Sequence, residues 1–290
     1  MAIWIRSKMC PSTNKDFFRV LTDGRVYVDY GPVSMVLSAM KNGVAQPSLC
    51  AAHAQAIPGI LEEIAEVRDQ LCRYPAEIHG KGLRGLPLEM VETVRRVGEP
   101  TLTPMATVAG TVADCVADQL FKEDVDTVIV NNGGDIALRL RRGASIRMGI
   151  LPDLAAGQIT QTITLTEEDG IGGVCTSGLG GRSFTRGIAN AVTVFSKRCM
   201  IADACATHLA NTSYVACDGV ITARAGDIKR ESDIAELQVV TQVGVLSDGV
   251  RKKSLKQIEA EAVRQARMGN VAAVFADVGG TAMAWHPNEV

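Results

Sequence analysis

The stretch Ile201-Ala202-Asp203-Ala204-Cys205-Ala206-Thr207-His208 places a carboxylate and a hydroxyl four positions apart in a run of small residues. We expect a helix from about Met200 to Ala210, in which Asp203 and Thr207 share one face. Small side chains let neighbouring backbone approach such a helix closely, and an aspartate buried there needs a partner. The pattern therefore indicates either a hard-oxygen site suited to Mg²⁺ or an aspartate that only forms local hydrogen bonds.

A second helix with many small residues is predicted from Thr103-Pro104 to about Leu120, since a hydroxyl residue followed by proline is a common helix start. Alanines and Gly110 recur along it, so another close backbone approach is expected. Two more helices are predicted to open at Pro58 and Pro87. The first of these should run to about Cys72.

A tight turn is predicted at Asn131-Asn132-Gly133-Gly134-Asp135, between an apolar strand at 126–130 and an alternating strand at 136–140. The two glycines also let a ligand come close to the backbone, where Asp135 is placed to hold a sugar hydroxyl. A similar strand, double glycine and strand recur at 274–283. The similarity indicates two ordinary β-hairpins or, as the alternative, a structural repeat.

A third segment is rich in glycine and hydroxyl groups: Gly172-Gly173-Val174-Cys175-Thr176-Ser177-Gly178, then Leu179-Gly180-Gly181-Arg182-Ser183. Its backbone N–H groups fit a phosphate cradle in which Arg182 or Arg186 pairs with the anion. The Gly-Lys-Ser/Thr ending of a Walker loop is missing. Cys175 and Ser177 are candidate nucleophiles, although no His or Lys base lies near them in the sequence. The alternative is a glycine-rich hairpin without a ligand.

The rest of the chain predicts short strands, one charged helix at about 255–268, and a last strand pair around Gly279-Gly280. The strands are expected at about 17–21, 25–29, 145–151, 159–166, 172–176, 188–195, 219–222 and 237–241. No linker or change of composition marks a boundary. Residues 1–290 are therefore interpreted as a single domain.

Composition narrows the class of protein. The 290 residues are 47% hydrophobic and 21% charged, which is typical of globular proteins. A net charge of −2 with 4% aromatic residues argues against a nucleic-acid partner. Without an apolar signal core or a membrane-length apolar run, we expect a cytoplasmic protein with no membrane partner. Eight cysteines without a C-x-x-C pair indicate reduced core residues. Base rates favour a homodimer.

In their order and spacing, these segments resemble the ApbE-like superfamily, whose best-known members are FAD:protein FMN transferases. The resemblance lies at residues 108–114, 132–135, 176–178 and 202–207. A cytoplasmic ApbE-like branch of bacteria and archaea, without a known activity, is more similar still. The similarity is strongest over residues 17–215, whereas 216–290 diverge. It implies an α+β fold, a mixed fold with antiparallel sheets and packed helices.

The resemblance also implies roles for individual residues. Asp203 and Thr207 resemble the family's Mg²⁺ ligands, with the carbonyl of Ala206 and one from residues 108–110 completing the site. The predicted flavin- or nucleotide-binding residues come from the turn and from the glycine-rich segment; they are Gly133, Gly134, Asp135, Thr176, Ser177, Gly178 and Arg182. The candidate catalytic residues are Cys175, Ser177 and Asp203.

Two departures from the transferases bear on the reaction. Their His-x-x-Asp-Pro-x-x-Gly stretch has no counterpart in residues 182–190, and Ala109 replaces a charged residue before Gly110. We therefore expect an enzyme that acts on a small anionic, flavin- or nucleotide-like or heterocyclic ligand, with Mg²⁺ and FAD as possible cofactors or with none. The alternatives are a divergent FMN transferase that consumes FAD, a flavin- or metabolite-binding accessory protein in sulfur assimilation, and a Cys or Ser hydrolase.

Overall fold

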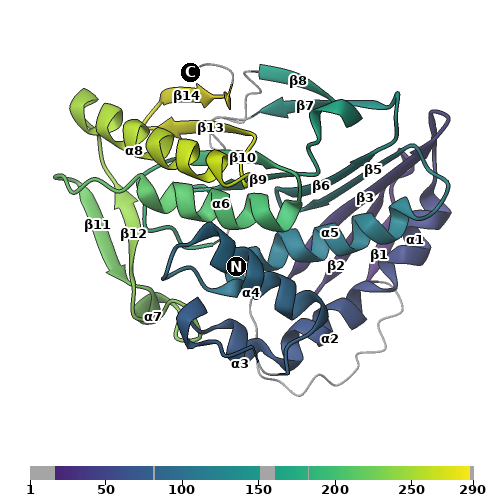
Figure 1. The fold of residues 1–290 in the computed structure, drawn as a ribbon, viewed down its shortest axis with the longest axis horizontal. Helices are drawn as coiled ribbons and strands as arrows, with labels where there is room; N and C mark the ends of the chain where they lie inside the picture. Colours follow the sequence, from purple (N-terminus) through teal and green to yellow (C-terminus); the bar gives the residue numbers. More distant parts are fainter. Residues whose placement is uncertain (1–16, 81, 151–160, 182, 288–290) are drawn as a thin grey trace.

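The computed structural model describes residues 17–80, 82–150, 161–181 and 183–287 of the chain. A ten-stranded antiparallel sheet runs through these residues (Figure 1). Its strands, in spatial order, are β1 (Phe18–Val20), β2 (Val26–Tyr30), β3 (Val33–Lys41), β5 (Thr127–Asn132), β6 (Asp135–Leu140), β9 (Gly173–Ser177), β10 (Ala191–Ser196), β13 (Ala273–Val278) and β14 (Thr281–Trp285), with β4 (Val44–Ala45) paired to β3. The fold is therefore α+β, as the sequence predicted.

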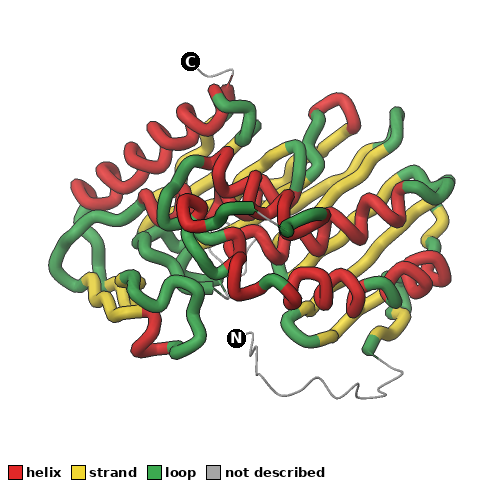
Figure 2. The backbone as a smooth tube through the Cα atoms, turned by 60° about the horizontal axis from the view of Figure 1, so that its bottom comes forward, coloured by secondary structure: helices red, strands yellow, loops and turns green. Residues whose placement is uncertain are grey.

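Helices cover one face of this sheet (Figures 1 and 2). They are α1 (Pro47–Ala54), α2 (Ile57–Glu66), α3 (Arg68–Leu71), α4 (Gly85–Val97), α5 (Val108–Phe121), α6 (Cys199–Thr212) and α8 (Asp248–Arg267), with the 3₁₀ turns η1 (Pro75–Glu77) and η2 (Pro104–Thr107). Helix α5 packs on β5 and β6, α6 on β9 and β10, and α8 on β13. The main hydrophobic core lies between these helices and the sheet.

The opposite face carries a smaller apolar cluster around Leu138, Val174 and Phe195. A two-stranded ribbon, β7 (Ser145–Ile150) and β8 (Gln161–Thr166), packs there and is followed by the 3₁₀ turn η3 (Glu167–Asp169). A second ribbon consists of β11 (Val220–Arg224) and β12 (Gln238–Val243). The short helix α7 (Ala225–Ile228) lies between these two strands in the sequence. Side chains alternate between the two faces along β9, so Val174 belongs to the smaller apolar cluster and Cys175 to the main core.

Several predicted elements differ in extent from those observed. The helix expected over 103–120 consists of the 3₁₀ turn η2 followed by α5. Thr103 precedes η2 but makes no side-chain cap, since its hydroxyl donates to the Asp233 carboxylate instead. The helix expected from Pro58 to Cys72 breaks at Val67 between α2 and α3. Parts of the strands predicted at 145–151 and 159–166 lie outside the described residues.

Strand β3 was not predicted. It alternates buried and half-buried side chains, with Val33, Met35, Leu37 and Ala39 inside. Serine and methionine weakened the β-branched signal in this segment, and the partners that bury it, β2 and β5, are set by the fold. Helices α1 and α7 were likewise not predicted.

The two helices with many small residues pack against each other, as their sequences predicted. A Cβ atom added to Gly110 on α5 would lie 2.6 Å from the carbonyl oxygen of Cys199 on α6. Alanine at Gly110 therefore cannot fit without moving one backbone. Among the described residues, no helix is both long and apolar enough to cross a membrane.

Candidate functional site

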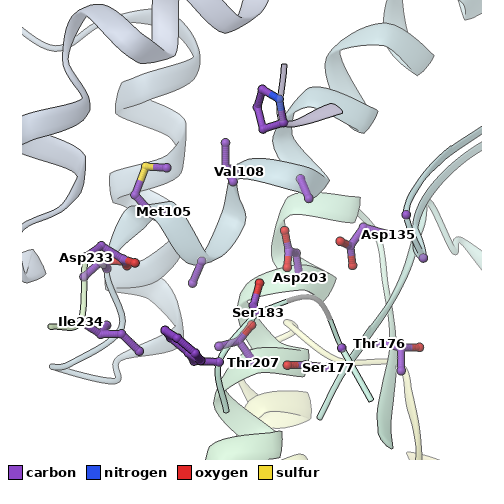
Figure 3. A pocket seen from close by; sticks show the side chains of 18 of the residues that line it. Met105, Val108, Asp135, Thr176, Ser177, Ser183, Asp203, Thr207, Asp233 and Ile234 are labelled. Atoms are coloured by element: carbon purple, nitrogen blue, oxygen red, sulfur yellow. The ribbon is translucent and has the colours of Figure 1, made fainter. Parts of the chain in front are cut away.

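One edge of the main sheet borders a cavity of about 1770 Å³. The antiparallel register brings the β2–β3 turn, the β5–β6 turn and the end of β9 to this edge. The helical side of the cavity is formed by η2, the start of α5 and one face of α6 (Figure 3). A cavity this large exceeds the roughly 300–1,000 Å³ of most small-molecule sites and has room for a dinucleotide.

Helix α6 presents a polar stripe to the cavity. Asp203, Thr207 and Asn211 all line it, at intervals of four residues along one face. The rise of an α-helix separates the first from the last by about 12 Å. The prediction that Asp203 and Thr207 share a face is thus confirmed, and the stripe extends one turn beyond them.

Asp203 also fixes the start of helix α5. Its Oδ2 accepts a hydrogen bond from the Gly110 backbone N–H at 2.9 Å. In return, Asp114 on α5 accepts one from the Met200 N–H in the first turn of α6, also at 2.9 Å. Each helix therefore supplies a carboxylate that satisfies an N–H in the first turn of the other. Asp203 therefore bonds to a residue of another helix, not locally as one alternative had it, and it still lines the cavity.

Asp114 is fully buried and belongs to an ion-pair cluster. Its carboxylate accepts from Arg139 of β6 at 2.7 Å and from Arg198 at 3.3 Å, while Asp118 binds the same two arginines from a more exposed position. Burial lowers the pKa of Arg139, but the Asp114 and Asp118 charges outweigh it and raise the net value. The cluster ties β6 to both helices and so fixes the hairpin relative to Asp203.

The β5–β6 turn lies at the cavity in the predicted conformation. Gly133 and Gly134 have φ angles of +67° and +110°, and the Asn131 side chain accepts a hydrogen bond from the Gly134 N–H. In Figure 3 the carboxylates of Asp135 and Asp203 are turned toward one another. Carboxylate oxygens from two elements thus face the same part of the cavity, and such oxygens are the ligands that divalent cations prefer.

The end of β9 contributes hydroxyl groups. Thr176, hydrogen-bonded to Thr193 at 2.8 Å, and Ser177 both line the cavity, as does Ser183. Gly178 does not line it. Its role is close packing, because a Cβ atom there would lie 2.6 Å from the Asn190 carbonyl oxygen and its φ is +143°.

The structure contradicts the prediction that Cys175 is a nucleophile. Its side chain is fully buried, its Sγ lies 3.4 Å from Cys199 Sγ, and it does not line the cavity. Burial, followed by the hydrogen bond with Cys199, raises the pKa of this thiol well above 9.0. A protonated, inaccessible thiol is not a nucleophile. Ser177, two residues further along β9, shares the face of Cys175 but stands at the end of the strand, where it reaches the cavity.

Ala206 also departs from its expected place. It is buried in the middle of α6 and does not line the cavity. Ala109 does line it, but its carbonyl accepts a hydrogen bond from Asn132 Nδ2. Within the described part of the chain no group of three His, Cys, Asp or Glu side chains is arranged to hold a metal. Any magnesium site would therefore rest on Asp203, Asp135 and Thr207 with ligand oxygens.

The far wall of the cavity was not predicted. It is formed by residues 228–234 and 237, within a stretch that begins at the last residue of α7 and that we call the 228–237 segment. Asp233 of this segment accepts from the Thr103 hydroxyl, and Arg68 Nη2 donates to the Glu231 carbonyl at 3.3 Å. Figure 3 shows Asp233 and Ile234 on the side of the cavity where Met105 lies. In the sequence, this charged stretch has the composition of an ordinary solvated loop.

Of the two arginines proposed for an anion, Arg182 lies outside the described residues. Arg186 lines the cavity and donates to Thr101 Oγ1 at 2.8 Å. Its backbone N–H donates to Asn211 at the end of the α6 stripe. The glycine-rich segment and the residues after it therefore line the cavity repeatedly between Thr176 and Arg186.

Comparison with known proteins identifies related chains. The chain is 37% identical to a UPF0280 protein of Methanopyrus kandleri, over 50% of this chain and 60% of that protein. It is 32% identical to one of Methanococcus aeolicus, over 56% of this chain and 67% of that protein. The match thus spans under two thirds of the Methanopyrus kandleri protein.

Among solved structures, the flavinyl transferase ApbE of Pseudomonas stutzeri aligns with a TM-score of 0.45 and 14% identity, over 87% of this chain and 91% of that one. The flavin transferase ApbE of Vibrio cholerae aligns at 0.46 and 14%, over 88% and 93%. No chemistry follows from likenesses this distant. The family model described as AbpE bacteria, however, matches residues 18–284, and the chain therefore belongs to that family, within the ApbE-like superfamily.

Proposed function

We propose that this protein is an enzyme that acts on a small anionic, flavin- or nucleotide-like ligand bound along helix α6. The observation that carries the proposal is the convergence of the Gly133-Gly134 turn, the Ser177 end of β9 and the Asp203 stripe on one cavity. These elements come from three separate parts of the sequence. Membership of the family makes FAD the first ligand to test, since the solved ApbE proteins are named flavin transferases.

The donor set fits Mg²⁺ bound together with ligand oxygens. Asp203 and Asp135 would hold the ion, with Thr207 beside them, and the ion would neutralise charge on oxygen atoms of the ligand. The chain's own groups bind and orient. The turn glycines let the ligand approach the backbone, and the hydroxyls of Thr176 and Ser177 are available to its polar atoms.

The thermal unfolding midpoint with FAD, FMN or AMP, each with and without Mg²⁺, tests this proposal. A ligand that binds only the folded state adds about 2.7 kcal/mol of stability at a hundredfold excess over its dissociation constant. We expect FAD to raise the midpoint in the presence of Mg²⁺. Asp203→Asn should abolish the Mg²⁺ dependence while its amide oxygen still accepts from Gly110. Release of AMP from FAD is then the assay for turnover.

The matched control is Asp218→Asn, which removes an exposed carboxylate outside the cavity and should leave the FAD response unchanged. A midpoint that responds to none of the three ligands would contradict the proposal. A response that is identical in the wild type and in Asp203→Asn would remove Asp203 from the binding site.

A further inference from the structure

Two arginine side chains line the end of the cavity away from Asp203. Arg68 comes from α3 and Arg186 from the loop between β9 and β10. In the described part of the chain, neither guanidinium has a carboxylate within ion-pair distance. Arg68 Nε is buried and has no hydrogen-bond partner among the described residues. A buried donor without an acceptor is costly, so a group that satisfies it in the bound state would be favoured.

The two arginines belong to one part of the cavity wall. Arg186 donates to Thr101, and Thr103, two residues on, donates to Asp233. Arg68 in turn donates to the Glu231 carbonyl, two residues before Asp233. Residues 101–103 and 231–233 therefore connect the arginines through three hydrogen bonds.

This end of the cavity carries an excess of positive charge. Arg230 lines it with the two arginines, against the carboxylates of Glu231 and Asp233. Three guanidinium groups and two carboxylates leave a formal charge of +1. A phosphate monoester, which carries about −1.5 to −2 at neutral pH, is attracted by this excess more strongly than a single carboxylate is. A guanidinium group can also donate two parallel hydrogen bonds to two oxygens of one phosphate.

We propose that Arg186 and Arg68 form a subsite for a phosphate group of the ligand, at the Asn211 end of the α6 stripe. This inference rests on the proposed function, because it describes the far end of the same ligand. Since Asn211 lies about 12 Å along the helix from Asp203, the substrate class is an elongated molecule. One polar group reaches Asp203 and Asp135, and a phosphate group reaches the arginines.

The test uses inorganic phosphate as the probe, without flavin or Mg²⁺. Excess broadening of the ³¹P resonance in the presence of the full chain reports phosphate in exchange with the protein. We expect broadening by the wild type and at least a fivefold reduction in Arg186→Gln and in Arg68→Gln. Arg73→Gln is the matched control. It removes an exposed arginine one residue beyond Cys72, outside the cavity, and should broaden the resonance like the wild type.

The unfolding midpoint of each variant without phosphate shows whether that variant is folded. Because the two arginines lie on different elements, one folded variant is enough to test the subsite if the other variant unfolds. Wild-type protein that does not broaden the resonance, or folded variants that broaden it equally, would overturn the subsite. Displacement of phosphate by an equal concentration of acetate would overturn its preference for phosphate. Asp203→Asn should keep the signal, so a failure of FAD binding and a failure of this subsite are distinguishable.

Discussion

The hairpins β5–β6 and β13–β14 have nearly the same turn and different surroundings. Both turns consist of two glycines with positive φ, at +67° and +110° for Gly133 and Gly134 and at +57° and +81° for Gly279 and Gly280. Both are closed by a side chain that accepts from the second glycine's N–H. The antiparallel register also brings both turns to the same edge of the sheet.

Their surroundings decide their roles. The first turn borders the cavity, while a Cβ atom added to Gly279 would lie 3.2 Å from Arg251 and 3.3 Å from Leu246. The second turn is therefore exposed, with side chains from the start of α8 beside Gly279, and it does not line the cavity. The comparison shows that a sequence of strand, two glycines and strand specifies a hairpin. Whether the hairpin has a binding role depends on the elements around its turn.

The two hairpins also differ in how they are anchored. The first is joined to α5 by the buried Asp114–Arg139 ion pair. The second lies under α8, which is held to α6 by a hydrogen bond of 2.8 Å between His208 and Glu261. The predictions below separate these anchors from the turns themselves.

The largest effect is expected from Asp114→Ala. It leaves Arg139 beside a buried, empty position and removes the acceptor for the Met200 N–H, so the unfolding free energy should fall by about 3–5 kcal/mol. Urea unfolding at pH 7 measures this loss. Asp118→Ala, which removes a partly exposed carboxylate from the same arginines, should cost only about 1 kcal/mol. An equal loss in both variants would show that burial of the Asp114 pair does not anchor the first hairpin.

An intermediate effect is expected from alanine in the two turns. Gly134→Ala and Gly280→Ala meet no atom within 4 Å, so each should cost about 1–2 kcal/mol through the positive φ alone. Only Gly134→Ala should also weaken the FAD-dependent shift of the unfolding midpoint. If Gly280→Ala weakens the FAD response as much, the second turn shares in ligand binding and the comparison fails.

The smallest effect concerns the anchor of α8. Burial raises the pKa of Glu261, but hydrogen bonds from His208, Arg264 and Gln265 outweigh it and lower the net value from 4.5 to about 2. Because this pKa is lower in the folded state, the stabilisation is present above about pH 4.5 and is lost as the pH falls toward 2.

Between pH 6 and pH 3, Glu261→Gln should therefore lose about 1 kcal/mol less unfolding free energy than the wild type, after allowance for solvent screening. Denaturant unfolding at both pH values measures the difference. Glu259→Gln, an exposed neighbour on α8, is the control and should follow the wild type. Parallel pH profiles for Glu261→Gln and the wild type would rule out this contribution.

Local sequence predicted much of the candidate site. The spacing of Asp203 and Thr207, the Gly133-Gly134 turn and the small residues around Gly110 each carry a short-range physical rule, and the structure bears out their geometry. Cys175 was misjudged because the sequence shows a thiol beside hydroxyls but not which face of β9 is buried. Successive side chains of a strand point to opposite faces, so Cys175 and Thr176 are separated. Which of these two faces is buried depends on the packing of α6 against β9.

By itself, the sequence determined the hairpins, the two helices with many small residues and the shared face of Asp203 and Thr207, since dihedral preferences and helical periodicity act over a few residues. Only the tertiary structure decided that Arg68 and the 228–237 segment close the same cavity. Arg68 and Glu231 are 163 positions apart. Contacts over such separations follow from how whole elements bury their apolar faces, and no local pattern encodes them.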